Sequence, residues 1–344
     1  MSGPRRTPPG RVLVARLDSD GDVLLAGPAV RAVAAHAAEV VLLVGPRGRQ
    51  AAALLPGVDR VLVWRAPWID PEPDPVDPAG VLAFTDRLRG LGLAEAVLLT
   101  SYHQSPLPLA LLLRLAGVPR VSAVSDDYPG SLLDLRHRVP GDLPEAERAV
   151  STAAAAGFGL PPGDDGRLRV REPLPDVAGL AGAGRYVVLH PGASVPARAW
   201  SPDRCAAAVA ALAGAGHRVL VTGGPPETTL TRAVAGTAGV DLGGRTSFAE
   251  LAAVLAGADV VVVGNTGPAH LAAAVGTPVV SLFAPVVPAA RWAPYRVPAV
   301  LLGDQEAPCR GSRARACPVP GHPCLDSVTP DEVVVAVDKL AGAA

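Results

Sequence analysis

The sequence predicts an α/β protein built from two doubly wound halves, each a parallel sheet with helices on both faces. Three observations predict this class. Strand-like apolar runs alternate with helix-like segments along most of the chain, a pattern typical of parallel sheets. A Gly- and Pro-rich stretch at 157–184 separates two such series. The length of 344 residues suits two domains of roughly 150 residues each.

Five strands and three helices are expected in the first half. Short apolar runs that end at polar, Gly or Pro residues predict strands at 11–16, 40–44, 61–64, 96–100 and 120–124. Apolar residues at helical spacing predict helices at about 23–38, 81–90 and 107–116. The intervening stretch 67–78 is rich in Pro and Asp, so we expect a loop there.

The second half repeats the alternation. Strands are predicted at 186–190, 218–222, 241–242, 260–263 and 279–283, and helices at 201–215, 227–235, 247–256, 268–275 and 329–340. Ser201, Ser247 and Thr329 precede their helices as N-caps, and Pro follows two of them at the first helical position. We therefore expect domains at 1–175 and 176–344, with the last helix, 329–341, packing back on the N-terminal half.

Composition excludes several classes of protein. There are 31 basic and 32 acidic residues, a net charge of -1, which is no footprint for nucleic acid. The only lysine is Lys339, so no Gly-rich stretch forms a Walker loop. Four cysteines are too few for a disulfide scaffold. No targeting segment is evident, and Pro and Gly interrupt the uncharged stretch 260–290, so we expect a soluble, cytoplasmic protein.

The first candidate site directly follows the first predicted strand. Open parallel sheets bind ligands beyond the carboxyl ends of their strands, and Asp18-Ser-Asp-Gly-Asp22 lies at such an end. Asp22, at the start of a helix, is placed to act as a general base toward a substrate hydroxyl. Alternatively, the segment is a solvated turn in which an Asp caps the helix.

A third interpretation of the same segment is a magnesium-dependent phosphatase. Asp18 and Asp20 resemble the Asp-x-Asp-Gly pattern of haloacid dehalogenase enzymes. Those enzymes also need a second carboxylate pair, which Asp126-Asp127 could supply, and a downstream lysine. Lys339, in the last helix, is poorly placed for that role.

The most informative motif in the chain is Gly264-Asn-Thr-Gly-Pro-Ala-His270. Four consecutive Val residues predict a strand before it, and Thr-Gly-Pro predicts a helix start after it. Free N–H groups and the positive end of the helix dipole then lie at a strand terminus, which is a seat for pyrophosphate. His270, in the first turn, adds a hydrogen bond to the ligand or is a buried core histidine.

Two further strand ends carry weaker signals. His190-Pro-Gly-Ala-Ser194 is a Gly-containing loop whose N–H groups suit an anion, and Arg198 follows as a permanently charged, planar phosphate partner. Glu227 follows the next strand and could accept hydrogen bonds from two ribose hydroxyls. Ordinary tight connections, and a first-turn Glu favoured by the helix dipole, are the alternatives.

A cysteine-rich segment lies near the C-terminus. Cys309, Cys317, Cys324 and His322 make four potential zinc ligands. Their spacing is irregular and lacks paired C-x2-C hooks, which favours a disulfide or a packed loop over a zinc site.

Together these motifs resemble glycosyltransferase family 9, the heptosyltransferase-like family with the GT-B fold. The resemblance runs from about Arg11 to Leu340 and includes Gly21-Asp22, His190-Pro-Gly-Ala, Arg198-Ala-Trp, the 264–274 motif and the 317–324 segment. It implies two Rossmann-like domains facing a central cleft. The GC-rich composition favours an actinobacterial-type member.

The resemblance also assigns roles. Asp22 is implied as the general base, Arg198 as a phosphate contact and Glu227 as the ribose contact, while 244–246 lines the nucleobase. The implied donor site is Gly192, Ala193, Ser194, Arg198, Glu227, Thr246, Asn265, Thr266, Gly267, Pro268 and His270. Asn265 replaces the family's usual Asp, which puts heptose itself in question as the donated sugar. Candidate acceptor contacts are Gly21, Asp18, Tyr102, His103 and Gln104, with Arg136 and His137 as weaker ones.

The activity so implied is inverting transfer of a heptose or related sugar from a nucleotide-diphosphate sugar, expected to be ADP-linked. The acceptor is a glycan or glycolipid at the inner membrane surface, and nucleic acid is not a partner. No cofactor or metal is expected, because arginine and helix-end amides stabilise the leaving diphosphate. Alternatives are the phosphatase, a GT-B sugar-nucleotide epimerase, and a non-catalytic nucleotide-sugar sensor.

Overall fold

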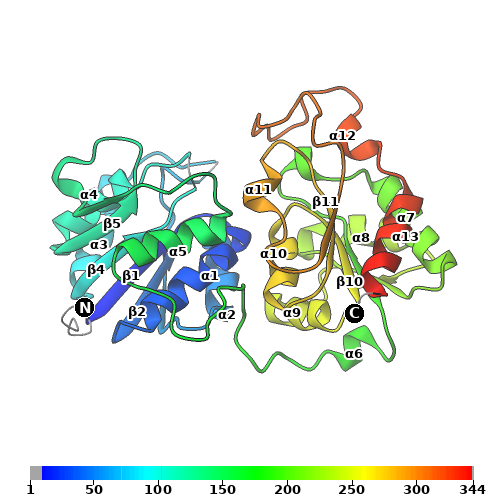
Figure 1. Cartoon of the computed structure of the whole chain (residues 1–344), viewed down its shortest axis with the longest axis horizontal. Helices are drawn as coiled ribbons and strands as arrows, with labels where there is room; N and C mark the ends of the chain where they lie inside the picture. The colour runs from blue at the N-terminus through cyan, green and yellow to red at the C-terminus, as the bar shows by residue number, and fades with distance from the viewer. Residues whose placement is uncertain (1–9, 71, 102, 343–344) are drawn as a thin grey trace. The chain divides into compact units, whose positions relative to one another are not determined.

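A computed structural model describes residues 10–70, 72–101 and 103–342 of the chain. The α/β class is confirmed: there are two parallel six-stranded sheets, with helices on both faces of each (Figure 1). By their internal contacts the residues divide into two compact units, Met1–Arg167 and Leu168–Ala344. This division falls somewhat before residue 175, where the sequence places the domain boundary. Each unit is described by itself below.

The sheet of the first unit has the strand order β3-β2-β1-β4-β5-β6, with every neighbouring pair parallel. Its apolar central strands are almost fully buried, as expected when helices cover both faces of a sheet. The strands are β1 (Arg11–Arg16), β2 (Glu39–Val44), β3 (Arg60–Val63), β4 (Leu93–Leu98), β5 (Arg120–Val124) and β6 (Leu135–His137).

The helices of the first unit form two pairs, because α1 packs on α5 and α3 packs on α4. A cluster of Leu, Val and Ala side chains fills the space between the sheet and the α3–α4 pair. The helices are α1 (Asp20–Ala34), α2 (Arg49–Leu54), α3 (Pro78–Arg89), α4 (Leu107–Leu115) and α5 (Glu145–Ala155). The helix expected from residue 23 begins earlier, at Asp20, because Ser19 is its N-cap and Asp22 lies in its first turn.

The second unit repeats the same design. Its strand order is β12-β11-β10-β7-β8-β9, again all parallel. The strands are β7 (Val187–His190), β8 (Val219–Val221), β9 (Val240–Asp241), β10 (Val260–Gly264), β11 (Val279–Leu282) and β12 (Ala299–Leu302). Its helices are α6 (Ala178–Ala181), α7 (Pro202–Gly214), α8 (Thr228–Ala235), α9 (Phe248–Ala256), α10 (Gly267–Ala274), α11 (Ala289–Trp292), α12 (Pro323–Asp326) and α13 (Pro330–Ala341).

The expected N-caps are confirmed, but the expected packing of the last helix is not. Ser201, Ser247 and Thr329 each accept a hydrogen bond from a first-turn backbone N–H. Helix α13 packs within the second unit, against α7 and strands β10, β11 and β12. Its apolar stripe, Val333, Ala336, Val337 and Leu340, belongs to the core of that unit. The stripe is therefore already buried there.

Both sheets change direction at their centre. In the first, the chain winds outward from β1 toward β3 on one side and from β4 toward β6 on the other. In the second, the same change falls between β7 and β10. Loops that leave such a pair of strands diverge and leave a crevice for ligands at the carboxyl edge. None of the helices in the described ranges is long and apolar enough to cross a membrane.

Candidate active site

Arg16 organises the crevice of the first unit. It ends β1, is 2% exposed, and faces three carboxylates: Asp18 at 2.9 Å from Nε, Asp22 at 3.0 Å from Nη2, and Glu145 at 3.4 Å from Nη1. Nη2 also donates to the Ser101 hydroxyl, beyond the end of β4, at 2.8 Å. One buried cation thus gathers groups from β1, α1, the β4 loop and α5 at the switch point.

Asp22 is held in one orientation by two neighbours. Its Oδ1 receives Nη2 of Arg16, and its Oδ2 accepts from the Ser19 backbone N–H at 3.2 Å and the Ser19 hydroxyl at 2.7 Å. The side chain is 18% exposed, so the carboxylate keeps some contact with solvent. An oriented and partly accessible carboxylate at this edge has the geometry that a general base needs.

Asp18 lies deeper in the same cluster. Nε2 of Gln104 donates to its carboxylate, and the Ser101 hydroxyl lies 3.4 Å away. Burial raises the pKa of Asp18, and the nearby Asp22 and Glu145 act in the same direction, against Arg16 and Gln104. Asp18 therefore serves the buried network, and Gln104 joins the β4 loop to it.

Asp20 points away from this cluster. Its Oδ1 accepts from the Ala51 backbone N–H at 2.8 Å, and burial raises its pKa to about 6. Asp18 and Asp20 thus serve different partners, and Asp126 and Asp127 are exposed on a distant part of the loop after β5. In the described ranges no three His, Cys, Asp or Glu side chains are grouped to hold a metal ion. The carboxylate pairs that a magnesium phosphatase requires are not assembled.

The crevice of the second unit begins at His190, the last residue of β7. Its Nδ1 is hydrogen-bonded to the Thr222 hydroxyl at 3.0 Å, and its Nε2 lies 3.9 Å from Glu227. Burial lowers the pKa of His190, while Glu227 acts in the opposite direction. Glu227 also accepts from the Gly224 backbone N–H at 2.7 Å, which fixes its carboxylate beside the end of β8.

The loops that leave four neighbouring strands of this sheet touch one another in sequence. Gly192 after β7 lies so close to the Glu227 carboxylate that a Cβ there would collide with it. The Gly244 N–H, after β9, donates to the Gly223 carbonyl at 2.9 Å. On the other side, a Cβ on Gly264 would lie 2.9 Å from the Arg198 carbonyl oxygen. The structure therefore brings the predicted donor residues together along one edge.

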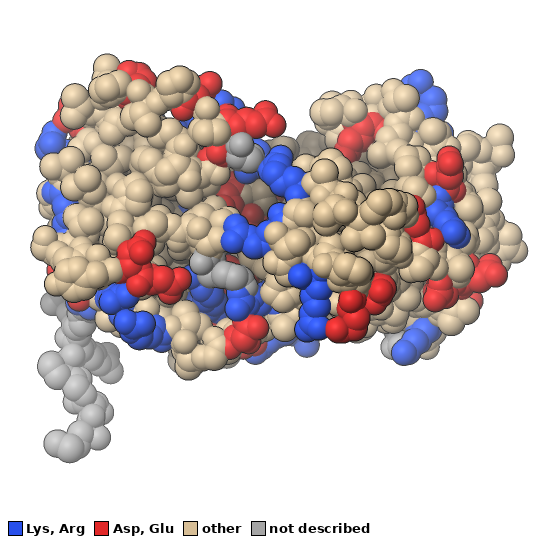
Figure 2. Space-filling view, turned by 90° about the horizontal axis from the view of Figure 1, so that it is seen from above, with Lys and Arg blue, Asp and Glu red and all other residues tan. Residues whose placement is uncertain are grey.

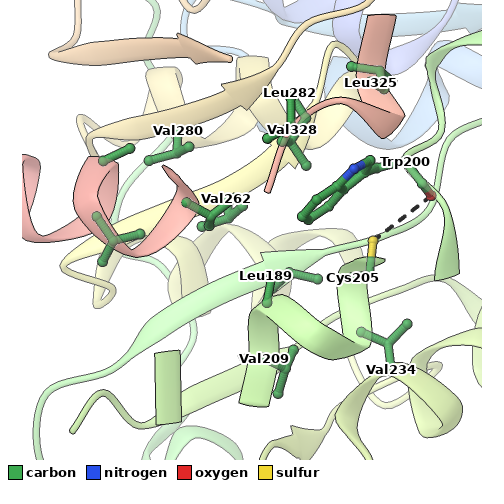
Figure 3. Packing of buried hydrophobic residues seen from close by; sticks show 14 of the residues in the cluster. Leu189, Trp200, Cys205, Val209, Val234, Val262, Val280, Leu282, Leu325 and Val328 are labelled. Atoms are coloured by element: carbon green, nitrogen blue, oxygen red, sulfur yellow. Dashed lines mark hydrogen bonds between the residues drawn. The ribbon is translucent and has the colours of Figure 1, made fainter. Parts of the chain in front are cut away.

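Arg198 stands on a short 3-10 turn, η3 (Pro196–Arg198), that is held from both directions. The Ala197 N–H donates to the Arg315 carbonyl at 2.9 Å, and Nε2 of His322 is hydrogen-bonded to the Ala197 carbonyl at 3.2 Å. After the turn, Trp200 is 3% exposed and lies among the core side chains, with the Cys205 thiol 3.9 Å from its carbonyl oxygen (Figure 3). The position of Arg198 is thus fixed by the segment near the C-terminus.

The start of α10 completes the edge. Thr266 is its N-cap, and Pro268 follows in the first turn, where N–H groups have no intrahelical acceptor. Asn265 is 4% exposed, and within the described part of the chain neither atom of its amide makes a hydrogen bond. His270 is buried at 6% exposure. Thr266 to Pro268 are half-buried, and they form the accessible part of the motif.

The cysteine segment is a packed loop. All four cysteines are free thiols, which excludes the predicted disulfide. Cys309 and Cys324 lie in the apolar core, and burial raises the pKa of Cys324 to about 12. Cys317 contacts the Val319 carbonyl, and His322 is used by Ala197. A zinc site is not assembled, because the imidazole that would complete it points to the backbone of η3.

The predicted acceptor residues have different fates. Gln104 joins the Asp18 network, Gly21 is buried in the first turn of α1, and His103 is exposed. Tyr102 lies outside the described residues. Arg136 donates to the carbonyl groups of Ser125 and Asp126, and His137 is hydrogen-bonded to Ser151 at 2.7 Å. Both hold their own loops.

The sequence argument missed the residues that fix these side chains. Arg16 was noted only as an interruption of an apolar run, although a charged residue that ends a buried strand signals a strand-end site. Glu145 and Ser101 carry no local motif, and only the topology brings them to Arg16. The role of His322 was equally hidden, because its partner, Ala197, lies far away in the sequence.

Two Rossmann-like units, each with a polar crevice at its switch point, define the GT-B class of protein. On the face shown in Figure 2, acidic and basic side chains lie among each other and among many uncharged ones. The family model of glycosyltransferase family 9 (heptosyltransferase) matches residues 103–321. The chain belongs to this family.

Known proteins similar to the chain include enzymes of lipopolysaccharide synthesis. Lipopolysaccharide heptosyltransferase 3 of Escherichia coli is 32% identical over 170 residues, 46% of this chain and 48% of that protein. The chain thus spans about half the length of this curated relative. A family 9 glycosyltransferase from Veillonella parvula has TM-score 0.76 at 16% identity, over 97% of both chains. E. coli heptosyltransferase WaaC with ADP-2-deoxy-2-fluoro heptose has TM-score 0.70 at 21% identity, over 96% of this chain and 99% of that one.

Proposed function

We propose that the chain is an inverting glycosyltransferase that moves a heptose or related sugar from an ADP-linked donor to a glycan or glycolipid acceptor. The observation that carries this proposal is the Arg16-held Asp22 at the switch point of the first unit. Family membership supports the reaction class, and the ADP-sugar bound by the WaaC structure supports the donor. With a glycolipid as acceptor, the reaction takes place at the inner face of the plasma membrane.

On the acceptor side, Asp22 accepts the proton of the attacking hydroxyl. Ser19 and Arg16 hold the two carboxylate oxygens in place, so the group needs no reorganisation as the proton moves. The hydroxyl oxygen attacks the anomeric carbon from the face opposite the nucleotide, which inverts its configuration. Asp18 and Gln104 support the cluster and contact the acceptor near this point.

On the donor side, the edge of the second unit receives the nucleotide diphosphate. Arg198 and the N–H groups at Gly192–Ser194 and Thr266–Pro268 stabilise the negative charge that develops as the diphosphate leaves. Glu227, fixed by Gly224, accepts from the ribose hydroxyls, and 244–246 lies beside the nucleobase. Asn265 and His270 are buried behind this surface and shape it. No cofactor takes part in these steps.

A thermal-shift panel tests the proposal. ADP, UDP and GDP are compared with and without magnesium, because a ligand that binds only the native state raises the melting temperature. Stabilisation by ADP above the other two, without metal, is expected. A response that requires magnesium and a phosphate analogue, with none to nucleotides, would sink the proposal and favour the phosphatase. Turnover of the donor without any acceptor would favour the epimerase, and binding without turnover the sensor.

A further inference from the structure

Two of the four tryptophans of the chain gather at one place that the proposed reaction does not use. Trp64 directly follows β3, and its ring stacks on Phe84 of α3, 4.0 Å between centroids at an angle of 2°. Trp68 meets Trp64 edge-on at 5.3 Å and 61°. Phe84 is 4% exposed and belongs to the core, whereas both indoles are only half-buried. In a chain with 3% aromatic residues, this is a concentrated aromatic surface.

A cavity of about 200 Å³ opens beside this surface. Its wall includes Trp64, Arg65, Asp74, Asp77, Gly80 and Val81. Pockets for drug-sized ligands have volumes of roughly 300 to 1,000 Å³, so this cavity suits a single ring and is small for a nucleotide. Because Trp64 is anchored on Phe84 and also lines the cavity, one wall of the cavity is a firmly held aromatic group.

The polar side chains of the cavity have an excess of negative charge. Arg65 is its only cation among the lining residues described, and it is paired with Asp70 at 3.2 Å and with Asp74 at 3.1 Å. Asp74 is 78% exposed, and Asp77 caps α3 by accepting from the Ala79 and Gly80 N–H groups. Phosphates and carboxylates are repelled by such a wall. Hydroxyl groups, which donate to carboxylates and accept from a guanidinium, are suited to it.

The aromatic surface is connected to the proposed acceptor site. Trp68 and Gln104 line the same small apolar recess beyond the ends of β1 and β4. Gln104 in turn donates to Asp18, which shares Arg16 with Asp22. A chain of contacts within one unit thus leads from the proposed base, through Gln104 and Trp68, to Trp64 and the cavity.

We propose that this cavity is a subsite for an uncharged pyranose ring of the acceptor. The Trp64 indole supports the apolar face of the ring, and Arg65 and Asp74 hydrogen-bond its hydroxyl groups. The acceptor is therefore a glycan or glycolipid with a neutral sugar beyond the residue that is glycosylated. This inference rests on the proposed function for its link to an acceptor, while sugar binding by the cavity can be tested without it.

The test is saturation-transfer NMR on the full chain with methyl glycosides of glucose, mannose and galactose, and with methyl glucuronide as the anionic probe. At least one neutral glycoside is expected to bind, with the glucuronide weaker. Trp64→Ala is expected to weaken neutral binding about tenfold, the loss of a ring-stacking contact. Asp74→Asn is expected to weaken neutral binding and strengthen the glucuronide, a reversal that general destabilisation would not produce.

The controls separate this subsite from other effects. Tyr128→Ala removes an 85% exposed aromatic residue of the same unit outside the cavity, and it is expected to change nothing. Binding of no neutral glycoside up to roughly 50 mM, far above a millimolar Kd, would overturn the inference. Binding unaffected by both cavity variants would overturn it as well. ADP stabilisation, measured on the same samples, reports on the transferase proposal separately, so either can fail while the other stands.

Discussion

The guanidinium of Arg16 lies 3.0 Å from the Asp22 carboxylate and ties it to the end of β1. The same guanidinium reaches Asp18 and Glu145, so one buried cation faces three acids. This arrangement fixes Asp22 more rigidly than a helix N-terminus alone would do. It also makes the stability of the first unit depend on the charge of these groups.

Asp22→Asn is expected to abolish most sugar transfer. The amide keeps the shape of the carboxylate but cannot take a proton, and general bases contribute roughly 10²- to 10⁴-fold to rate. Initial rates with a matched donor and acceptor measure the loss. ADP should still raise the melting temperature of the variant, because the proposed donor site lies in the other unit. Asp86→Asn, at a 69% exposed helix position, is the control, and full turnover by Asp22→Asn would remove this residue from the mechanism.

Arg16→Met is expected to destabilise the chain in a pH-dependent way. Removing one partner of a buried ion pair costs about 3 to 5 kcal/mol, and here three carboxylates lose their cation. Without it their pKa values rise further above those of the unfolded chain, so the folded state binds more protons. The deficit should therefore grow as the pH rises from 5 to 8. Urea unfolding at several pH values checks this, and a deficit that does not vary with pH would contradict it.

Asp20→Asn is expected to stabilise the protein at neutral pH. Burial raises the pKa of Asp20 from 3.8 to about 6, so the native state binds the proton more tightly than the unfolded state does. Stability from this group therefore falls as the pH rises from about 4 to 6 and is then constant. The amide still accepts from the Ala51 N–H without this penalty, a gain of roughly 1 to 3 kcal/mol at pH 7.5 that vanishes near pH 4. Unchanged stability at pH 7.5 would show that the carboxylate is not penalised, and unchanged transfer is the matching expectation for activity.

Gly192→Ala is expected to weaken donor binding about tenfold or more, a loss of roughly 1.4 kcal/mol. The added Cβ collides with the Glu227 carboxylate, so Glu227 must leave its place beside Gly224. Calorimetric titration with ADP measures the effect. Gly214→Ala in α7, where a Cβ meets nothing within 4 Å, is the matched control and should bind ADP as the parent does. Equal affinities for the two variants would remove Gly192 and Glu227 from the donor site.

His322→Ala is expected to weaken ADP binding through Arg198. The imidazole is hydrogen-bonded to the Ala197 carbonyl and holds η3, so its loss leaves the turn fixed on one side only. A neutral hydrogen bond contributes about 1 kcal/mol, which corresponds to a fewfold change in Kd. His322→Gln can donate to the same carbonyl and should recover most of the affinity. Equal weakening by both variants would indicate a packing role for the ring instead.

Most of the strand–helix alternation could be predicted, because each central strand is a continuous apolar run. The strands β1 and β5 have the predicted bounds, Arg11–Arg16 and Arg120–Val124. The two missed strands, β6 and β12, both lie at a sheet edge. Edge strands are half exposed and need no apolar run, so Leu135–His137 and Ala299–Leu302 carry little periodic signal.

The candidate site was predicted in outline only. Asp22, Arg198, Glu227 and the Thr266–Pro268 helix start all lie at strand ends, as local motifs indicate. The same motifs could not show that Asp20 turns away to Ala51 while Asp18 turns to Arg16, because neighbouring residues at a helix start point in different directions. The zinc and disulfide alternatives for the cysteines failed for a similar reason, since the spacing said nothing of where His322 points.

The sequence by itself determined the fold class, the two halves and the strand ends at which polar side chains gather, because burial of apolar runs is a local property of the chain. Only the tertiary structure decided which of those side chains meet. Arg16 meets Glu145 across 129 positions, and His322 meets Ala197 across 125. The reason is that parallel strands place residues from distant segments at one edge of a sheet, and the order of the strands in space is not written in any local pattern.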